Sequence, residues 1–286
     1  MSKNASHMET TIAAAEFAEL LATSDRDAGA FPLDRACLLV SAAIDPQTDI
    51  EACETVLDEL AERAAAISGR SCEPYAQASA LIDSIFSLGG FRGNILDYGA
   101  SGNSMLARVI ADRTGIPITL SIVLMETARR VGLRLDGVGL PAHFVVRFPD
   151  PTSRLFIDPF HGGAIIDESD CRALVERVYG GKLTWRDDFL DSVEPRVILK
   201  RLVLNLKNAL SNEKNYIAAL AAIQLQLVID PDDPAELRDR GIILARLHRY
   251  ESAISDLEAY LARMPDAGDG DHIRNTVRYL RRATSY

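Results

Sequence analysis

The segment from Gly115 to Phe160 places the strongest constraint on how this chain can fold. It contains a helical pattern over Thr119–Val131 that is apolar on nearly all faces of its first two turns, which predicts a central buried helix. Two apolar segments follow: His143 stands at the head of an alternating β segment, and Asp158 ends the next segment. A buried helix followed by two strands predicts an α+β fold.

The two polar residues of these segments are expected to meet. If the strands pair as a hairpin, His143 and Asp158 lie side by side, because cross-strand neighbours have Cβ atoms about 5 Å apart. An Asp beside a His fixes its tautomer and supports it as a base. Taken alone, His143 would be interpreted as a strand-end histidine with a backbone partner. As part of a reactive site, the pair needs a nucleophile at the start of the preceding helix, where a thiol has a lowered pKa.

Several motifs in and around this segment resemble the SirB-type branch of the transglutaminase-like superfamily, over roughly residues 30 to 265. The resemblance implies a mostly helical α+β protein: a transglutaminase-like (papain-like) core with a small antiparallel sheet, then an α-helical tetratricopeptide-like unit. The motifs are Gly-Ile-Pro-Ile-Thr-Leu-Ser (115–121), Gly-Val-Gly-Leu-Pro-Ala-His-Phe-Val-Val-Arg (137–147), Ile-Asp-Pro-Phe-His-Gly-Gly (157–163), Gly-Gly-Phe-Arg-Gly-Asn (89–94) and Asn-Ser (103–104).

The resemblance also implies where a nucleophile would stand. Thr119 or a close neighbour falls where the superfamily has its cysteine, and no cysteine lies between Cys72 and Cys171. A Thr hydroxyl is far harder to ionise than a thiol. We therefore interpret His143, Asp158 and Thr119 as catalytic positions that are a relic of the superfamily's chemistry. A simpler role for Thr119 is to satisfy backbone donors at the helix start.

Three further residues are candidates for binding in the same cleft: Asn103, Ser104 and His161. Asn103 and Ser104 precede a helix predicted over Met105–Arg113, where either is a suitable N-cap; that Asn103 orients a cleft residue is implied only by the resemblance. His161 lies in a predicted turn and is more simply an exposed loop histidine. A metal site made of His143, Asp158 and His161 is not expected, because these residues lack the helix spacing of ligands. No cofactor is expected.

The first third of the chain is predicted to be helical and to contain no chemistry. Apolar residues recur at helical spacing, with a break at Asp25–Gly29. Cys72 precedes a helix start, but an ordinary loop cysteine is favoured, since no histidine is near it in the sequence. The predicted helices span Glu9–Ala22, Leu33–Ile44, Asp49–Ile67 and Tyr75–Leu88, and Asp167–Tyr179 is a further helix beyond the core strands.

From about residue 200 the sequence repeats with a period of 34, as Tyr216 and Tyr250 illustrate. Leu237, Gly241, Ala253 and Pro265 fall at the spacing of a tetratricopeptide repeat. In such a repeat small residues let paired helices approach closely. A final helix is predicted over His272–Ala283. We expect three parts: a vector-derived leader (1–8, including His7), a helical region with the transglutaminase-like core (9–192), and the repeat domain (193–286).

Charge and cysteine content exclude several classes of protein. The net charge of −10 opposes nucleic-acid binding, which needs a basic surface. The four cysteines form no CxxC pair, so we expect free thiols in a reducing cytoplasm rather than zinc sites or disulfides. We identify no signal peptide, and the longest apolar run, Ile116–Met125, covers about half a bilayer, so no membrane association is expected.

Two functional hypotheses follow. In the first, the protein is a non-catalytic scaffold or regulatory adaptor that binds a protein or peptide through its cleft and repeat. In the second, it is a hydrolase or acyl-transferase in which a hydroxyl of Thr119, Ser121 or Ser104 attacks, His143 is the base and Asp158 orients it. The missing cysteine favours the first hypothesis.

Overall fold

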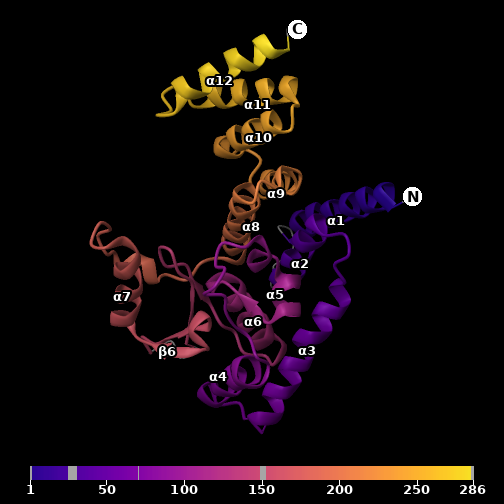
Figure 1. Ribbon diagram of the computed structural model, residues 1–286. Helices are drawn as coiled ribbons and strands as arrows, with labels where there is room; N and C mark the ends of the chain where they lie inside the picture. Colours follow the sequence, from indigo (N-terminus) through magenta and orange to yellow (C-terminus); the bar gives the residue numbers. More distant parts are fainter. Residues whose placement is uncertain (1, 25–30, 70, 149–152, 285–286) are drawn as a thin grey trace. The chain divides into compact units, whose positions relative to one another are not determined.

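The computed structural model of this chain describes residues 2–24, 31–69, 71–148 and 153–284 (Figure 1). The chain divides into two compact units, Met1–Leu202 and Val203–Tyr286, and the boundary falls inside helix α8 (Pro195–Asn212). The sequence-based division at 192/193 precedes this helix. The predicted break at Asp25–Gly29 lies outside the described residues.

The first unit begins with the helices that the apolar periodicity predicts. The last of them changes character half-way: its second half is a π-helix, in which buried Ser84 donates a hydrogen bond to the carbonyl of Leu60. The expected leader overlaps the first helix, of which the side chains are described only beyond residue 11. The bounds are α1 (Ser2–Ser24), α2 (Leu33–Ile44), α3 (Ile50–Ile67), α4 (Pro74–Ile82) and η1 (Asp83–Leu88).

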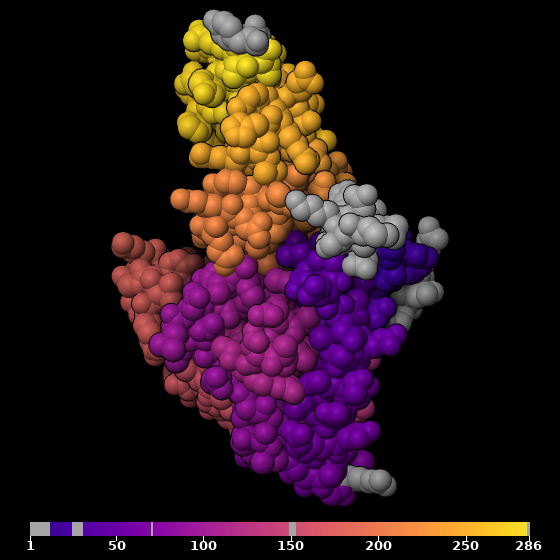
Figure 2. Space-filling view, turned by 45° about the vertical axis from the view of Figure 1, so that its right-hand side comes forward, coloured from indigo at the N-terminus to yellow at the C-terminus, as the bar shows by residue number. Residues whose placement is uncertain are grey.

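Helix α6 (Pro117–Arg130) is the centre of the first unit (Figure 1). It is buried from Pro117 to Ala128 and contacts α2, α3, α4 and α5 as well as the sheet strand β4. The predicted central helix is thus present, and it starts at Pro117 because proline is well suited to the first helical turn. In the space-filling view the purple N-terminal helices and the magenta segment that follows residue 100 adjoin on one face (Figure 2).

The sheet of the first unit is antiparallel and has four strands in the order β3-β4-β5-β6. The predicted hairpin is β4 paired with β5, with Val146 opposite Ile157. Two features were not predicted from the sequence: β6, which follows the predicted turn at residues 160–163, and a short parallel pair of β1 with β2. The bounds are β1 (Arg92–Gly93), β2 (Thr114–Gly115), β3 (Gly137–Val138), β4 (Val145–Arg147), β5 (Phe156–Asp158) and β6 (Ala164–Ile166).

The expected cap of helix α5 (Leu106–Asp112) is wrong. Asn103 and Ser104 lie in a preceding 3₁₀ turn, η2 (Ser101–Ser104), and Met105 occupies the N-cap position without a side-chain hydrogen bond. Asn103 is buried and bonds elsewhere, as described below. Residues 101–104 therefore form a 3₁₀ turn before α5, instead of supplying the N-cap of that helix.

Helix α7 (Glu168–Tyr179) follows β6 along the chain (Figure 1). Its N-cap, Asp167, accepts hydrogen bonds from the backbone of Ser169 and Asp170. Cys171 and Val175 join the buried side chains of the strands in one core cluster. The only tryptophan, Trp185, packs against this cluster just before a short 3₁₀ turn, η4 (Asp187–Leu190).

The second unit has the predicted repeat. The matching helices α9 (Tyr216–Ile229) and α11 (Tyr250–Arg263) both start at a tyrosine of the repeat, and α10 (Pro234–Arg246) and α12 (Gly270–Ala283) complete the unit. A Cβ atom at Gly241 would lie 2.7 Å from the side chain of Leu257, so glycine permits the close approach of α10 and α11. The chain is therefore a mostly helical α+β protein, in which a helical unit with a small antiparallel sheet is followed by a unit of paired helices. Within the described residues, no helix has both the length and the apolar character needed to cross a membrane.

Candidate functional site

The carboxylate of Asp158 is the centre of the candidate site. It stands at the end of β5, is buried and accepts hydrogen bonds at both oxygens. Oδ1 accepts from the backbone N–H groups of Phe160 and His161, at 3.0 and 3.4 Å, and thereby caps the 3₁₀ turn η3 (Pro159–His161). These two bonds fix the orientation of the carboxylate and leave Oδ2 for side chains.

His143 lies 3.0 Å from this second oxygen, through its Nε2 atom. His143 precedes β4 and is not part of the strand. The register of β4 with β5, continued to this position, places Phe160 opposite His143. The imidazole of His143 therefore reaches Asp158 diagonally across the hairpin. The residue before it, Ala142, has φ +60°, a left-handed conformation that is unfavourable for a residue with a side chain. Such local strain is found mainly where the surrounding structure holds a functional geometry.

His161 is the third member of the cluster; from the sequence it was a candidate for this cleft, although an exposed loop histidine was the simpler interpretation. Its Nδ1 atom lies 2.7 Å from Oδ2 of Asp158, the same oxygen that His143 approaches. The side chain of His161 is 45% exposed, whereas that of His143 is 10% exposed. The cluster is thus open to solvent on the side of His161. The imidazole of His161 nevertheless points to Asp158.

The protonation of Asp158 is set by two opposing effects. Burial raises the pKa of this carboxyl, but the hydrogen bonds and charges of His143, and next of His161, outweigh burial and hold the pKa below its ordinary value. Asp158 is consequently an anion at neutral pH. Among the described residues, no Lys or Arg forms an ion pair with it, so the two histidines are its only side-chain partners.

One wall of the site is the aromatic ring of Phe160, which meets the ring of His143 edge-on. Tyr98 packs against the other part of this ring, with 5.8 Å between the centroids. A Cβ atom at Gly93 in β1 would lie 2.6 Å from the carbonyl oxygen of Phe160, so the strand can approach η3 only with glycine at this position. Packing from the Gly-rich loop therefore holds the turn that contains His161.

Asn103 does not contact Phe160 through a hydrogen bond among the described residues; it bonds the loop that contains Tyr98. Its amide donates to the carbonyls of Asp97 and Tyr98, at 2.7 and 3.1 Å, and its Oδ1 accepts from Asn94. These bonds hold the loop that places Tyr98 on Phe160. Asn103 is therefore a positioning residue for the loop, and no hydrogen bond among the described residues joins its side chain to His143.

Thr119 has the simpler of its two expected roles. Its hydroxyl is fully buried and accepts from the backbone N–H of Ile116 at 3.1 Å. The carbonyl oxygens of Asn103 and Ile116 lie 2.9 and 3.0 Å away as acceptors for its single proton. All of its partners are backbone groups, so this hydroxyl stabilises the start of α6.

The remaining nucleophile candidates are also buried. Ser104 and Ser121 are both nearly inaccessible, and within the described part of the chain neither has a hydrogen bond to His143. The charge of Asp158 also acts on the thiol of Cys171 in α7: burial, with the charge of Asp158 as the next cause, raises the pKa of this thiol to about 12. At neutral pH this thiol is protonated and not nucleophilic.

The three residues His143, Asp158 and His161 can nevertheless act together as ligands. One ligand atom from each lies within 4.8 Å of the others. These residues lack the spacing of ligands on a helix, and the end of β5 and the capped turn η3 bring them together instead. The signal available in the sequence was the pair Asp158 and His161 itself, three residues apart around a proline turn.

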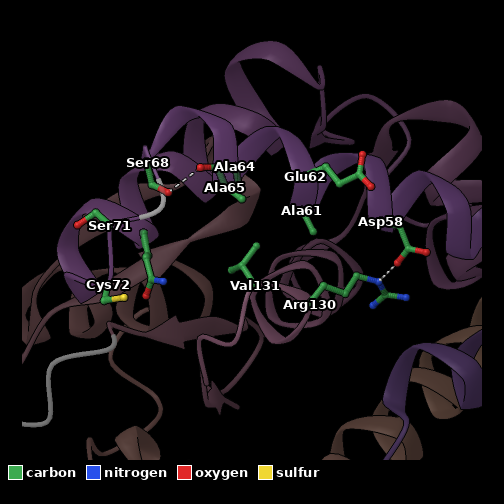
Figure 3. Close-up of a pocket in the computed structure, with 11 residues that line it drawn as sticks. Asp58, Ala61, Glu62, Ala64, Ala65, Ser68, Ser71, Cys72, Arg130 and Val131 are labelled. Atoms are coloured by element: carbon green, nitrogen blue, oxygen red, sulfur yellow. Dashed lines mark hydrogen bonds and ion pairs between the residues drawn. The ribbon is translucent and has the colours of Figure 1, made fainter.

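A separate hollow contains the other cysteine considered from the sequence. This hollow, of about 540 Å³, lies between α3, the end of α6 and the loop of Ser71 and Cys72 (Figure 3). Arg130 crosses one end and pairs with Asp58 at 2.6 Å. None of the lining residues is a histidine, so Cys72 has no base beside it and the interpretation as an ordinary loop cysteine is retained.

Comparisons with known proteins agree with this architecture. Residues 51–204 match the family described as the transglutaminase-like superfamily, and residues 206–278 match the tetratricopeptide repeat. No solved structure matches the chain.

Relatives extend the match over most of the sequence. A UPF0162 protein of Xylella fastidiosa (strain Temecula1) is 34% identical over 66% of this chain and 69% of its own length. A UPF0162 protein of Vibrio cholerae is 28% identical over 91% of this chain and 97% of its own length. Protein SirB1 of Salmonella typhimurium is 26% identical over 63% and 67%. The chain therefore belongs to the transglutaminase-like superfamily, in the SirB-type branch that adds tetratricopeptide repeats after the core.

Proposed function

We propose that this protein is a non-catalytic scaffold or adaptor that binds a protein segment, in a cytoplasmic setting that keeps its thiols reduced. The observation that carries the proposal is the state of Thr119, whose hydroxyl is buried and bonded only to backbone groups. A nucleophile must be free to approach both the base and a substrate. Thr119 meets neither requirement.

The thiol of Cys171 does not replace it. Its pKa of about 12 means that only about one molecule in a hundred thousand has a thiolate at neutral pH. The second candidate function, a hydroxyl-dependent hydrolase or acyl-transferase, rests on the His143–Asp158 contact of 3.0 Å. Since Nε2 of His143 is directed to Asp158, a nucleophile would have to meet the other nitrogen, Nδ1.

The repeat unit offers a surface for a partner. Tetratricopeptide helices form extended binding surfaces. A hollow of about 530 Å³ on the second unit is lined mostly by polar and charged side chains, among them Arg240 and Asp256, which pair at 2.6 Å. Its two leucines, Leu220 and Leu244, are buried. Arg249 lies exposed on the rim. A polar hollow with charges of both signs fits a peptide that has charged and polar side chains.

Activity assays provide the direct test of the non-catalytic proposal. Wild-type protein and the His143→Ala variant would be assayed for hydrolysis and for amine transfer on a broad peptide panel. We expect no turnover above the uncatalysed rate from either. Turnover by wild type that His143→Ala abolishes would overturn the proposal and favour the hydroxyl-dependent enzyme.

Partner capture tests the binding half of the proposal. Tagged wild type would be compared with Arg249→Glu, which reverses a charge on the rim of the hollow, and with Arg246→Glu, an exposed charge reversal outside it. A protein retained by wild type and Arg246→Glu but lost with Arg249→Glu is expected. Equal capture by all three proteins would show that this hollow is not the binding surface.

A further inference from the structure

The cluster at Asp158 has a feature that a simple hydrogen-bonded triad does not require. Two imidazole nitrogens, Nε2 of His143 and Nδ1 of His161, converge on one carboxylate oxygen at 3.0 and 2.7 Å. Buried carboxylates in proteins are normally paired with a cation or coordinate a metal. Asp158 is buried, yet no Lys or Arg forms an ion pair with it within the described residues.

We propose that His143, Asp158 and His161 form a binding site for a divalent transition-metal ion of the zinc or iron(II) class. Two neutral imidazoles with one carboxylate are a donor set that such ions use when part of their coordination remains open. The harder ions magnesium and calcium are held by oxygen ligands and do not suit two nitrogen donors.

The distances fit such an ion. With metal–ligand bonds of about 2.1 Å in a tetrahedral arrangement, ligand atoms stand about 3.4 Å apart. The two nitrogen–oxygen separations in the cluster are 3.0 and 2.7 Å, and all three ligand atoms lie within 4.8 Å of one another. Side-chain movements of the order of 1 Å would therefore produce the coordination geometry.

Protonation is also compatible. A neutral imidazole has one N–H, and moving that proton to the other ring nitrogen frees the nitrogen that faces Oδ2. Nδ1 of His143 and Nε2 of His161 are the nitrogens that would receive it. Neither has a hydrogen bond in the described part of the chain, so this change of tautomer breaks no other bond.

Neighbouring backbone and side-chain groups fix the three proposed ligands, and the site is open to solvent on one side. The backbone N–H groups of Phe160 and His161 fix the carboxylate through Oδ1, as outer contacts do in metal sites. The guanidinium of Arg201 donates to the carbonyl of His143 at 2.8 Å and anchors that ligand through its backbone. The half-exposed ring of His161 leaves the remaining coordination positions on the solvent side.

Metal uptake by the full-length protein tests this inference and does not depend on the scaffold proposal. Zn²⁺ affinity would be measured by competition with a chromophoric chelator, under reducing conditions, for wild type, His161→Ala and His143→Gln. His272→Ala, an exposed histidine of α12, is the matched control. Trp185 fluorescence would verify that each variant keeps the native first unit.

We expect wild type and His272→Ala to bind one equivalent of Zn²⁺, and His161→Ala to bind at least about 100-fold more weakly, because even outer contacts typically contribute 10- to 100-fold. His143→Gln should weaken binding similarly. Co²⁺ in place of Zn²⁺ should give visible bands without the intense near-ultraviolet absorption of a thiolate ligand. Absence of uptake, equal affinity of wild type and His161→Ala, or a Co²⁺–thiolate spectrum would each overturn the site.

Discussion

The two ends of helix α6 each meet a buried acidic cluster, but the two clusters hold their carboxyl groups in opposite states. Near the N-terminal end, η3 brings Asp158 against the helix, with two histidines and two backbone N–H groups as donors. At the C-terminal end, Glu126 of α6 and Asp34 of α2 share two arginines, Arg129 and Arg130.

The difference follows from what surrounds each acid. Asp158 is the only carboxyl in its cluster, and its donors hold its pKa below the ordinary value although it is buried. Glu126 is buried beside a second acid: burial, followed by the charge of Asp34, raises its pKa to about 7, and Arg129 offsets only part of this. Converging donors therefore keep one acid anionic, whereas a neighbouring acid makes the other hold a proton near neutral pH.

The clusters share one property, since each keeps a buried thiol neutral. Cys171 has its pKa raised to about 12 by burial and the charge of Asp158. Burial, followed by the charges of Glu126 and Asp34, raises the pKa of Cys37 well above its ordinary value. Cys72, by contrast, is exposed.

Thiol labelling tests whether both clusters keep their thiols neutral, and it has the largest expected effect of three experiments on these clusters. At pH 7.5 iodoacetamide should label Cys72, while Cys171 reacts at least about 1000-fold more slowly, because a thiol with a pKa of about 12 is almost never ionised. Cys37 should also react slowly, because burial raises the pKa of its thiol well above the ordinary value. Peptide mass spectrometry would give the rate at each cysteine. In 6 M guanidinium all four should react alike. Native labelling of Cys171 as fast as Cys72 would mean that the His–Asp cluster has a usable thiol.

Replacing Asp158 tests how much its buried carboxylate contributes to the stability of the first unit. Asp158→Ala leaves two backbone N–H groups and the imidazole of His143 without their acceptor, so we expect the free energy of unfolding of the first unit to fall by about 4 kcal/mol. Urea unfolding followed by the fluorescence of Trp185 reports on this unit alone. The exposed acid Asp112 on α5 provides the control, and Asp112→Ala should change the value by less than about 0.5 kcal/mol. Equal effects of the two variants would contradict the central role of Asp158.

The two clusters also differ in how far the sequence predicts them. His143 and Asp158 stand at the ends of neighbouring strands, so hairpin pairing alone suggests their contact. His161 was assigned to an exposed turn, because nothing in the spacing shows that Asp158 would cap that turn and draw the imidazole inward. The helices and the repeat were predicted from periodicity, which records burial directly, whereas the transglutaminase-like core was implied by the family resemblance.

The second cluster escaped prediction entirely. Asp34 and Arg129 are separated by 95 positions in the chain, and their contact depends on how α2 packs on α6. The only local signal was an acidic residue within an otherwise apolar helical stretch, at Asp34 and again at Glu126. Likewise, Asn103 looked like a helix cap because of its position, whereas its bonds are made to a loop whose course the sequence does not specify.

The protonation of Glu126 should make the stability of the protein depend on pH. The raised pKa of Glu126 determines the sign of this dependence, which is the smallest of the three expected effects. The folded-state pKa of about 7 lies above that of the unfolded chain, so between pH 4.5 and 7 the folded protein binds more protons than the unfolded one. Stability is therefore greatest below the unfolded pKa and declines as pH rises through about 7. Glu126→Gln imitates the protonated acid at every pH and should remove this decline, which amounts to about 3 kcal/mol at most.

The measurement compares urea unfolding of wild type and Glu126→Gln at pH 5 and pH 8. The advantage of the Gln variant over wild type should grow with pH, and Glu62→Gln, an exposed acid on α3, should not show this trend. If the difference between wild type and Glu126→Gln is the same at both pH values, Glu126 is ionised throughout. The arginines would then outweigh the second carboxyl, and the two ends of α6 would hold their acids in the same state.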